Sequence, residues 1–224
     1  MEIYKEKANL YDKYMKAIKK DYEEELNSIL PFLKKGNIIL ELGGGTGNFA
    51  EILSKKGFKI ICSDISEEMM DIAKKKNLIC KKIDMRNFVL DKKVDLIISL
   101  FNTIMYNKDE KEFNKNIISV KDNLNQDGKF IIEVTNPEKL LGMDKFVNSL
   151  EIDPGIYLTH INKRDKNYFF HYFIFIDTNL KECSIDSHKT RIFKSIQIKK
   201  LLEREFRKVE ILEKGNHIYF ISTK

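Results

Sequence analysis

Tryptophan is absent from this 224-residue sequence, and proline and cysteine each occur only three times. The cysteines, Cys62, Cys80 and Cys183, are odd in number, far apart and not part of a C-x-x-C pair. A disulfide framework is therefore not indicated, and we expect free thiols in a reducing cytoplasm. The sequence also has no histidine cluster and no H-E-x-x-H motif, so no metal site is predicted.

Long apolar runs and long basic blocks are also missing. No stretch approaches the length of a membrane span, and residues 1–7 lack the apolar segment of a signal peptide. The 40 basic and 34 acidic residues are interleaved and leave a net charge of +6. This pattern indicates a solvated surface, so we expect a cytoplasmic protein that binds neither membrane nor nucleic acid. A basic groove for a small acidic substrate remains open.

What the sequence does contain is a regular alternation of short apolar runs and helical patterns, beginning at residue 37. The apolar fraction of 42% is sufficient for a sizeable core. Alternation at this interval predicts βαβ units in a doubly wound, Rossmann-like α/β sheet of seven strands. Strands are predicted at 38–42, 58–63, 78–83, 94–100 and 129–134, and an antiparallel hairpin closes the sheet at 208–212 and 217–222.

Two segments break this rhythm. Residues 9–34 predict one or two helices, within an N-terminal helical cap spanning 1–36. Residues 154–193 contain strand-like runs with no helix between them, and Tyr168–Ile176 is too apolar for an exposed edge. We therefore predict a core of 37–135 and 195–224, interrupted by an antiparallel β insertion at 136–194. That insertion is expected to cover the substrate side of the sheet or to form a subunit contact.

A glycine-rich turn follows the first predicted strand and reads Glu41-Leu42-Gly43-Gly44-Gly45-Thr46-Gly47. Glycine lets a ligand lie against bare backbone, beside the N-terminus of the next helix. The spacing E-x-G-x-G-x-G breaks the dinucleotide fingerprint G-x-G-x-x-G, and the acid suits a ligand with a cationic amine better than a pyrophosphate. The turn resembles the nucleotide-binding loop of class I S-adenosylmethionine-dependent methyltransferases. This resemblance implies S-adenosylmethionine as the cofactor and S-adenosylhomocysteine as the product.

Each of the first three predicted strands ends in an acid: Glu41, Asp64 or Asp84. Ligands of open parallel sheets bind outside the carboxyl ends of the strands, so the three carboxylates are expected to share one site. We expect Glu41 to interact with the methionyl amine, directly or through water. Asp64 is expected to accept both ribose hydroxyls and Asp84 the adenine amino group. The predicted cofactor site is completed by Tyr22, Gly43, Gly45, Ile65, Met69, Met85 and Leu100.

The loop after the fourth strand, residues 100–106, is expected to face the sulfonium. Methyl transfer is a direct displacement, so an enzyme mainly aligns the nucleophile and excludes water. An amine nucleophile must be neutral, and tyrosine hydroxyls can orient it and stabilise the positive charge that develops. Tyr11 and Tyr106 are therefore the candidate catalytic residues, and Phe101 is a candidate substrate contact.

Several motifs follow one another in an order that resembles the nucleotide-sugar N-methyltransferases, which dimethylate amino sugars of macrolide pathways. They are Tyr11 with Lys20-Asp21-Tyr22, the glycine turn, Asp84-Met85-Arg86-Asn87-Phe88, Phe101-Asn102-Thr103-Ile104-Met105-Tyr106 and Ser187-His188-Lys189-Thr190-Arg191-Ile192-Phe193. The resemblance covers nearly the whole chain. It implies that Tyr11 and Tyr106 lie by the amine, that the insertion covers the substrate and that the protein forms a homodimer.

One departure concerns the substrate. Family members carry tryptophans just after the strand-five glutamate, whereas this chain reads Glu133-Val134-Thr135-Asn136-Pro137. His171 and His188 are candidate substrate residues that the resemblance places on the inner face of the insertion; the alternative is a structural histidine in a strand.

The favoured function is N-methylation of a small molecule, a nucleotide-linked amino sugar. Three alternatives stay open: O- or N-methylation of another small metabolite such as a glycine-type amine, a non-catalytic S-adenosylmethionine-binding protein, and a nicotinamide oxidoreductase, which the broken fingerprint disfavours.

Overall fold

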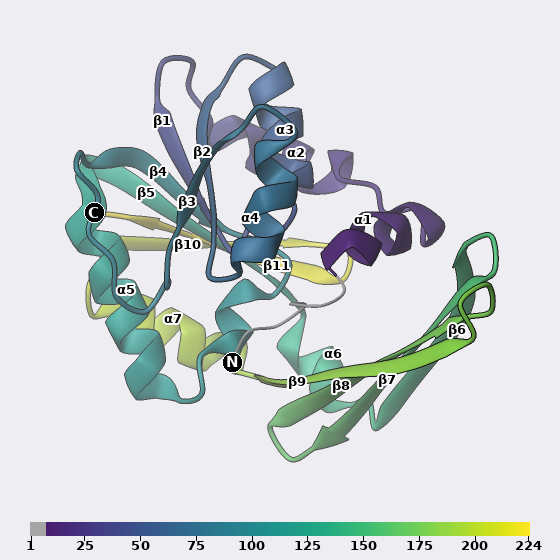
Figure 1. Ribbon diagram of the computed structural model, residues 1–224. Coiled ribbons are helices and arrows are strands. Elements are labelled where there is room, and N and C mark those ends of the chain that lie inside the picture. The colour runs from purple at the N-terminus through teal and green to yellow at the C-terminus, as the bar shows by residue number, and fades with distance from the viewer. Residues whose placement is uncertain (1–7) are drawn as a thin grey trace.

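The computed structural model describes residues 8–224 and contains two separate β-sheets (Figure 1). The larger sheet has seven strands in the order β10-β11-β5-β4-β1-β2-β3. Its central strands pair in parallel, whereas β11 runs antiparallel to both β5 and β10. The strands are β1 (Ile38–Leu42), β2 (Lys59–Asp64), β3 (Ile79–Lys82), β4 (Val94–Ser99), β5 (Leu124–Thr135), β10 (Lys208–Lys214) and β11 (His217–Thr223).

Helices cover both faces of this sheet, as Figure 1 shows. On one face, apolar side chains of α5 (Glu110–Asn123) and α7 (Ser195–Glu203) pack on the sheet. On the other face, α2 (Glu23–Ile29), α3 (Asn48–Lys55) and α4 (Glu67–Lys74) form a second apolar cluster. Alternate residues of each central strand enter opposite clusters, because successive side chains of a strand point to opposite faces. The predicted doubly wound sheet is confirmed.

The smaller sheet is antiparallel and has four strands in sequential order, β6 (Lys145–Asp153), β7 (Ile156–Asp165), β8 (Tyr168–Asp177) and β9 (Glu182–Arg191). It lies between α6 (Pro137–Leu141) and α7 in the chain. As its apolar sequence predicted, β8 is an interior strand. The edge strand β6 was not predicted, because most of its side chains are exposed and its apolar pattern is weak.

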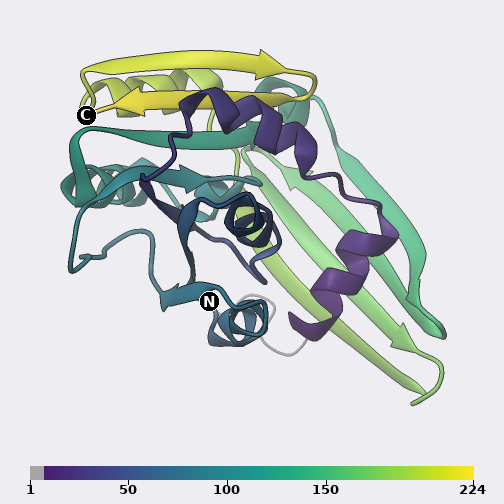
Figure 2. The same ribbon diagram turned by 90° about the horizontal axis from the view of Figure 1, so that it is seen from above.

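The N-terminal helix α1 (Ala8–Ala17) lies against the four-stranded sheet, as Figure 2 shows from above. Its Leu10 packs in a small cluster with side chains of β6, β7 and β8, and the Tyr14 hydroxyl lies 3.2 Å from Nδ1 of His160. The predicted helical region 9–34 is therefore two helices, followed by the 3₁₀ turn η1 (Leu30–Phe32), with a break in which Lys19 has a φ of 52°. Residues 1–7 of the predicted cap lie outside the described residues.

One predicted strand differs from the structure. It was expected at 129–134, but β5 begins at Leu124 and accommodates residues 125–128 as an irregularity in its pairing with β4. Asp127 adopts a positive φ of 62° there, which absorbs the extra residues without ending the strand. At the start of α4, the Ser66 side chain caps the helix by accepting a hydrogen bond from the Met69 amide.

Nothing in the described part of the chain forms a helix both long and apolar enough to cross a bilayer. The boundaries of cap, core and insertion stay predictions.

Candidate functional site

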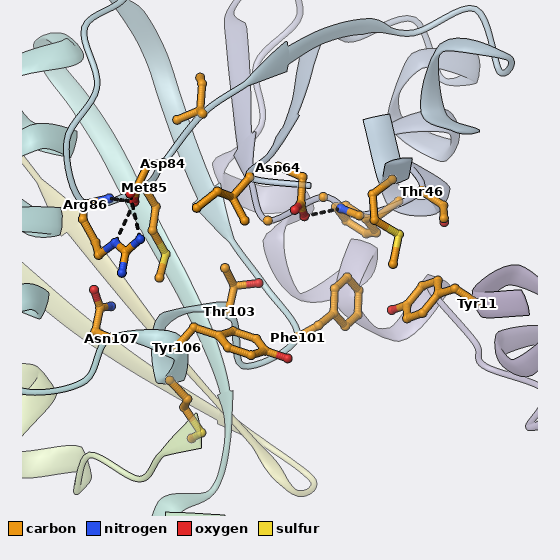
Figure 3. A pocket seen from close by; sticks show the side chains of 18 of the residues that line it. Tyr11, Thr46, Asp64, Asp84, Met85, Arg86, Phe101, Thr103, Tyr106 and Asn107 are labelled. Atoms are coloured by element: carbon orange, nitrogen blue, oxygen red, sulfur yellow. Dashed lines mark hydrogen bonds and ion pairs between the residues drawn. The ribbon is translucent and has the colours of Figure 1, made fainter. Parts of the chain in front are cut away.

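A cavity of about 460 Å³ opens at the carboxyl ends of β1, β2 and β4. This is where the strand order reverses and where ligands of doubly wound sheets bind. Figure 3 shows Tyr11, Asp64, Asp84, Phe101 and Tyr106 around it. The predicted site residues that line the cavity are Tyr11, Tyr22, Gly43, Gly45, Asp64, Ile65, Met69, Asp84, Met85, Phe101 and Tyr106.

The glycine turn forms one wall of the cavity. Gly43, Gly45 and Gly47 have φ values of 69°, 55° and 79°, a region that residues with a Cβ rarely adopt. At Gly43 an added Cβ would also lie 2.3 Å from Cγ2 of Thr103, on the loop after β4. The turn therefore needs glycine for both its conformation and its close approach to that loop, and it ends at the N-terminus of α3.

Glu41 lies behind this wall and does not line the cavity. Its side chain is 2% exposed, and its Oε2 has no hydrogen-bond partner among the described residues. Burial, together with the nearby Asp64, raises the pKa of Glu41 to about 8. Only glycine fits at position 44, because a Cβ there would lie 2.8 Å from Oε2 of Glu41. The predicted Leu100 is likewise buried below the loop and absent from the lining.

Asp64, at the end of β2, is held by two backbone amides. Oδ2 accepts a hydrogen bond from the Gly45 amide at 3.0 Å and Oδ1 from the Ser66 amide at 2.9 Å. Burial raises the pKa of Asp64, while these backbone hydrogen bonds oppose the rise. The carboxylate is thus fixed in direction, and its remaining lone pairs are available to hydroxyl donors.

Asp84, in the loop after β3, has a partner that the sequence reasoning missed. Arg86 binds it in a two-pronged pair, with Nε 2.8 Å from Oδ1 and Nη2 2.7 Å from Oδ2. This arginine lowers the pKa of Asp84. The sequence does place an acid and a base two positions apart. Whether two such residues pair within a loop depends on the backbone geometry, which their spacing does not determine.

The loop after β4 is held in an unusual conformation. Phe101 and Asn102 have φ values of 56° and 63°, although neither is glycine. Oε2 of buried Glu133 accepts from the Phe101 amide at 2.5 Å, and the Asn102 side chain exchanges two hydrogen bonds with Thr135. His217 lies 2.5 Å from the other Glu133 oxygen. These contacts fix the start of η2 (Thr103–Tyr106), which carries Tyr106.

A second polar network holds α1 over the cavity. Asp12 Oδ1 accepts from the Thr46 hydroxyl at 2.5 Å and from the Asn48 amide at 2.8 Å, and Asp12 Oδ2 pairs with Lys76 at 2.8 Å. The network thereby places the neighbouring Tyr11 at the cavity wall. Burial, followed by the nearby Tyr22 and Tyr106, raises the pKa of Tyr11, so its phenol stays neutral.

The insertion adds basic side chains that were not predicted. Lys189 and Arg191 of β9, together with Lys108 after η2, line the cavity. Arg191 donates through Nη1 to the Lys108 carbonyl at 3.2 Å, and its buried Nε has no partner among the described residues. A guanidinium at the cavity wall suits an anionic ligand.

The predicted His171 and His188 do not line the cavity. They are cross-strand neighbours whose rings stack at 4.7 Å, and His171 stacks on His160 at 5.9 Å. Three histidines that are far apart in sequence therefore form a column, which sequence reasoning did not foresee. Among the described residues, no group of His, Cys, Asp or Glu side chains is arranged to hold a metal ion.

Comparison with known proteins agrees with this geometry. The methyltransferase domain family matches residues 11–168. A relative from Streptomyces venezuelae, named dTDP-3-amino-3,4,6-trideoxy-alpha-D-glucopyranose N,N-dimethyltransferase, is 26% identical over 132 residues, or 56% of each chain. The matched segment thus spans little more than half of that relative.

Two solved structures share the fold along nearly the whole chain. The Streptomyces venezuelae DesVI structure has a TM-score of 0.82 at 22% identity, covering 96% of this chain and 97% of that one. An S-adenosylmethionine-dependent methyltransferase from Clostridium acetobutylicum has a TM-score of 0.78 at 23% identity, covering 96% of both chains. The chain belongs to the methyltransferase domain family. Its predicted class, the S-adenosylmethionine-dependent methyltransferases, is confirmed.

Proposed function

We propose that this chain transfers the methyl group of S-adenosylmethionine to the amine of a nucleotide-linked amino sugar. The observation that carries the proposal is that one cavity brings three groups of residues together. They are the glycine turn with the nearby Asp64 and Asp84, the tyrosines Tyr11 and Tyr106, and the basic set Lys108, Lys189 and Arg191. The amino-sugar dimethyltransferase from Streptomyces venezuelae supports the same substrate class.

The residues around the glycine turn fit the cofactor. Glu41 lies behind the turn with a buried Oε2 that lacks a donor, and it is assigned to the methionyl ammonium through a bridging water. Asp64 is already oriented by two amides and retains acceptor capacity for the ribose hydroxyls. Asp84, ionised beside Arg86, is assigned to the adenine amino group. The apolar contacts to the ring are assigned to Ile65, Met69 and Met85, with Tyr22 at the wall and Leu100 supporting the loop from below.

The two tyrosines are assigned to the acceptor amine. S-adenosylmethionine supplies an electrophilic methyl group, so the chain's task is to align a neutral amine and keep water out. A neutral phenol at Tyr11 and the hydroxyl of Tyr106 can accept amine N–H bonds and stabilise the positive charge that develops on nitrogen. Phe101, which packs edge-on against Tyr22 at 5.6 Å, closes the apolar part of the wall.

The basic set favours a nucleotide-linked acceptor over a glycine-type amine. A glycine-type amine carries one carboxylate, whereas a diphosphate presents several oxygens to Lys108, Lys189 and Arg191. The strongest indication is that all three cationic side chains line one cavity, where charge-assisted hydrogen bonds to phosphate oxygens are strong.

We further propose that the outer face of the four-stranded sheet is a contact between two copies of the chain. Its register brings exposed apolar side chains onto one face, away from the histidines: Val147, Tyr157, Tyr172, Ile176 and Ile185. Light scattering of the intact chain at several concentrations tests this, and Ile185→Lys is expected to shift a dimer toward monomer. A monomer at every concentration would contradict it.

The function is tested in two stages. Thermal-shift titration with S-adenosylmethionine, S-adenosylhomocysteine and NADH should show stabilisation by the two adenosyl ligands alone, since ligands that bind only the folded state raise its apparent stability. Methyl transfer is then measured to dTDP-3-amino-3,4,6-trideoxyglucose, the corresponding free amino sugar and glycine. Turnover of the nucleotide-linked compound is expected to dominate; preferential turnover of glycine would replace the proposed substrate class.

A further inference from the structure

Tyr106 is in contact with a residue of the histidine column. Tyr106 lines the cavity, and its hydroxyl lies 3.1 Å from Nε2 of His188. His188 is 6% exposed and is absent from the cavity lining. The imidazole therefore contacts the proposed acceptor site through the tyrosine.

The position of the His188 ring is fixed by the four-stranded sheet. His188 pairs with His171 across β8 and β9, and their rings are nearly parallel, with an interplanar angle of 19°. The Phe173 ring lies 5.5 Å from His188, again nearly parallel, at 21°. Side chains that stand on paired strands and stack on both neighbours have little rotational freedom, so the direction of Nε2 is set before any ligand binds.

The His188 ring is neutral. Burial, and then the neighbouring His171 and His160, lowers the pKa of His188 to about 3, and burial lowers the pKa of His171 to about 4. A neutral imidazole has one N–H and one lone pair, so toward Tyr106 it either donates or accepts. Because its protonated form is so unfavourable, the ring is a poor place to store the proton that an amine loses after methylation.

The direction of this hydrogen bond matters for an amine nucleophile. If the Tyr106 hydroxyl donated to the amine, it would occupy the nitrogen lone pair that must attack the methyl carbon. If the hydroxyl instead donates to His188, its oxygen presents only lone pairs to the cavity. An amine N–H can then donate to that oxygen while the nitrogen lone pair stays free.

We propose that His188 is a positioning residue for methyl transfer, which accepts the Tyr106 hydroxyl proton at Nε2 and so makes Tyr106 a hydrogen-bond acceptor toward the amine. This inference rests on the proposed function. As the new N–C bond forms, the old C–S bond breaks and its electron pair stays on sulfur. The ammonium proton then leaves to water, and His188 keeps its protonation state throughout.

The first test is a double-mutant cycle on methyl transfer to dTDP-3-amino-3,4,6-trideoxyglucose. His188→Phe is expected to lower kcat ~10–100-fold and leave the S-adenosylhomocysteine-induced thermal shift unchanged, whereas His188→Gln, which keeps an acceptor, retains more activity. In a Tyr106→Phe background, His188→Phe should have no further effect. Additive losses in the double variant would overturn the inference, because a merely structural histidine acts independently of the hydroxyl.

His160→Phe is the matched control. It removes a partly buried imidazole of the same column, which stacks on Phe173 at 4.1 Å and whose hydrogen bond goes to Tyr14 of α1. Its kcat is expected to stay within about twofold of the unmodified chain. A loss equal to that of His188→Phe would assign the effect to sheet packing and reject a specific role for His188.

The second test does not depend on the acceptor. Nitrogen-15 NMR of labelled histidine, with S-adenosylhomocysteine added, should show His188 protonated at Nδ1 and bare at Nε2, with the Nε2 resonance shifted in Tyr106→Phe. A proton on Nε2 would reject the inference even if the enzyme turns over. Conversely, no turnover by the unmodified chain contradicts the proposed function, while the nitrogen spectrum separately decides the direction of the bond.

Discussion

The two sheets contribute to the site in different ways. The seven-stranded sheet shapes the cavity with backbone: positive-φ glycines, strand ends and amides that orient Asp64. The four-stranded sheet contributes side chains, from β8 and mostly from β9. The alternation of β9 sends His188 to the column and Lys189 and Arg191 to the cavity wall. One strand therefore serves both the proposed amine end and the proposed phosphate end of the site.

This difference between the sheets separates cofactor binding, which many proteins share, from the choice of acceptor, which is specific. A site made of backbone tolerates few residue types, so it is shared by proteins that use the same cofactor. A site made of strand side chains can change its chemistry one residue at a time without altering the fold. We therefore expect variants of the first sheet to abolish cofactor binding and variants of the second to alter acceptor use.

The largest effect is expected from Gly43→Ala. The added Cβ would meet Thr103 at 2.3 Å and sit at a φ of 69°, so the turn must move. Affinity for S-adenosylmethionine, measured by calorimetry, should fall at least ~100-fold, or about 2.7 kcal/mol. Gly36→Ala is the control, because Gly36 also has a positive φ but a Cβ there meets nothing. It should cost about 1–2 kcal/mol of stability and leave affinity unchanged. Equal affinities in both variants would mean that the turn does not bind the cofactor.

A similar effect, but confined to turnover, is expected from removing the cavity hydroxyls. Tyr106→Phe and Tyr11→Phe should each lower kcat ~10²-fold, because the amine loses an orienting partner, with little change in cofactor affinity. Tyr157→Phe, on the outer face of the four-stranded sheet, should retain full turnover. Normal kcat in both cavity variants would leave the cofactor site intact but remove the proposed acceptor site.

The sequence predicted the backbone-made half of the site better than the half made of side chains. Gly43, Asp64 and Asp84 were found because local spacing and strand ends are visible over a few residues. Glu41 was expected at the site, but its burial behind Gly44 was not, because depth is a property of packing. The basic set and the histidine column were missed as groups, because their members meet only through strand pairing and loop contacts.

A smaller effect is expected from the basic set. Lys189→Met should raise KM for a nucleotide-linked acceptor ~10-fold, about 1.4 kcal/mol, with kcat nearly unchanged, because the charge is proposed to bind phosphate and not the reacting nitrogen. The effect should shrink as salt is added. Lys163→Met, an exposed lysine of β7 outside the cavity lining, is the control. If KM is the same for both variants, the phosphate assignment fails.

The last effect is a change of stability with pH and not of turnover, and it is expected from the titration of Glu41. Its carboxyl has a folded pKa of about 8, above its unfolded value of 4.5, so the folded state holds a proton that the unfolded state has released between these values. Stability of the ligand-free protein should therefore fall as pH rises through this window, by at most about 1.4 kcal/mol per pH unit. Burial raises the pKa of Asp64 as well, which adds to the same slope at its acidic end.

Glu41→Gln removes this carboxyl and keeps the shape of the side chain. Urea unfolding at pH 6, 7 and 8 should give a flatter dependence in the variant than in the unmodified chain. Saturating S-adenosylmethionine should also flatten the pH dependence of stability in the unmodified chain. An ammonium near Glu41 favours the ionised carboxylate and so lowers its pKa. If the slope persists in Glu41→Gln, the pH dependence comes from other groups. If the ligand leaves the slope unchanged, the ammonium lies away from Glu41, and the buried acid is a feature of the turn alone.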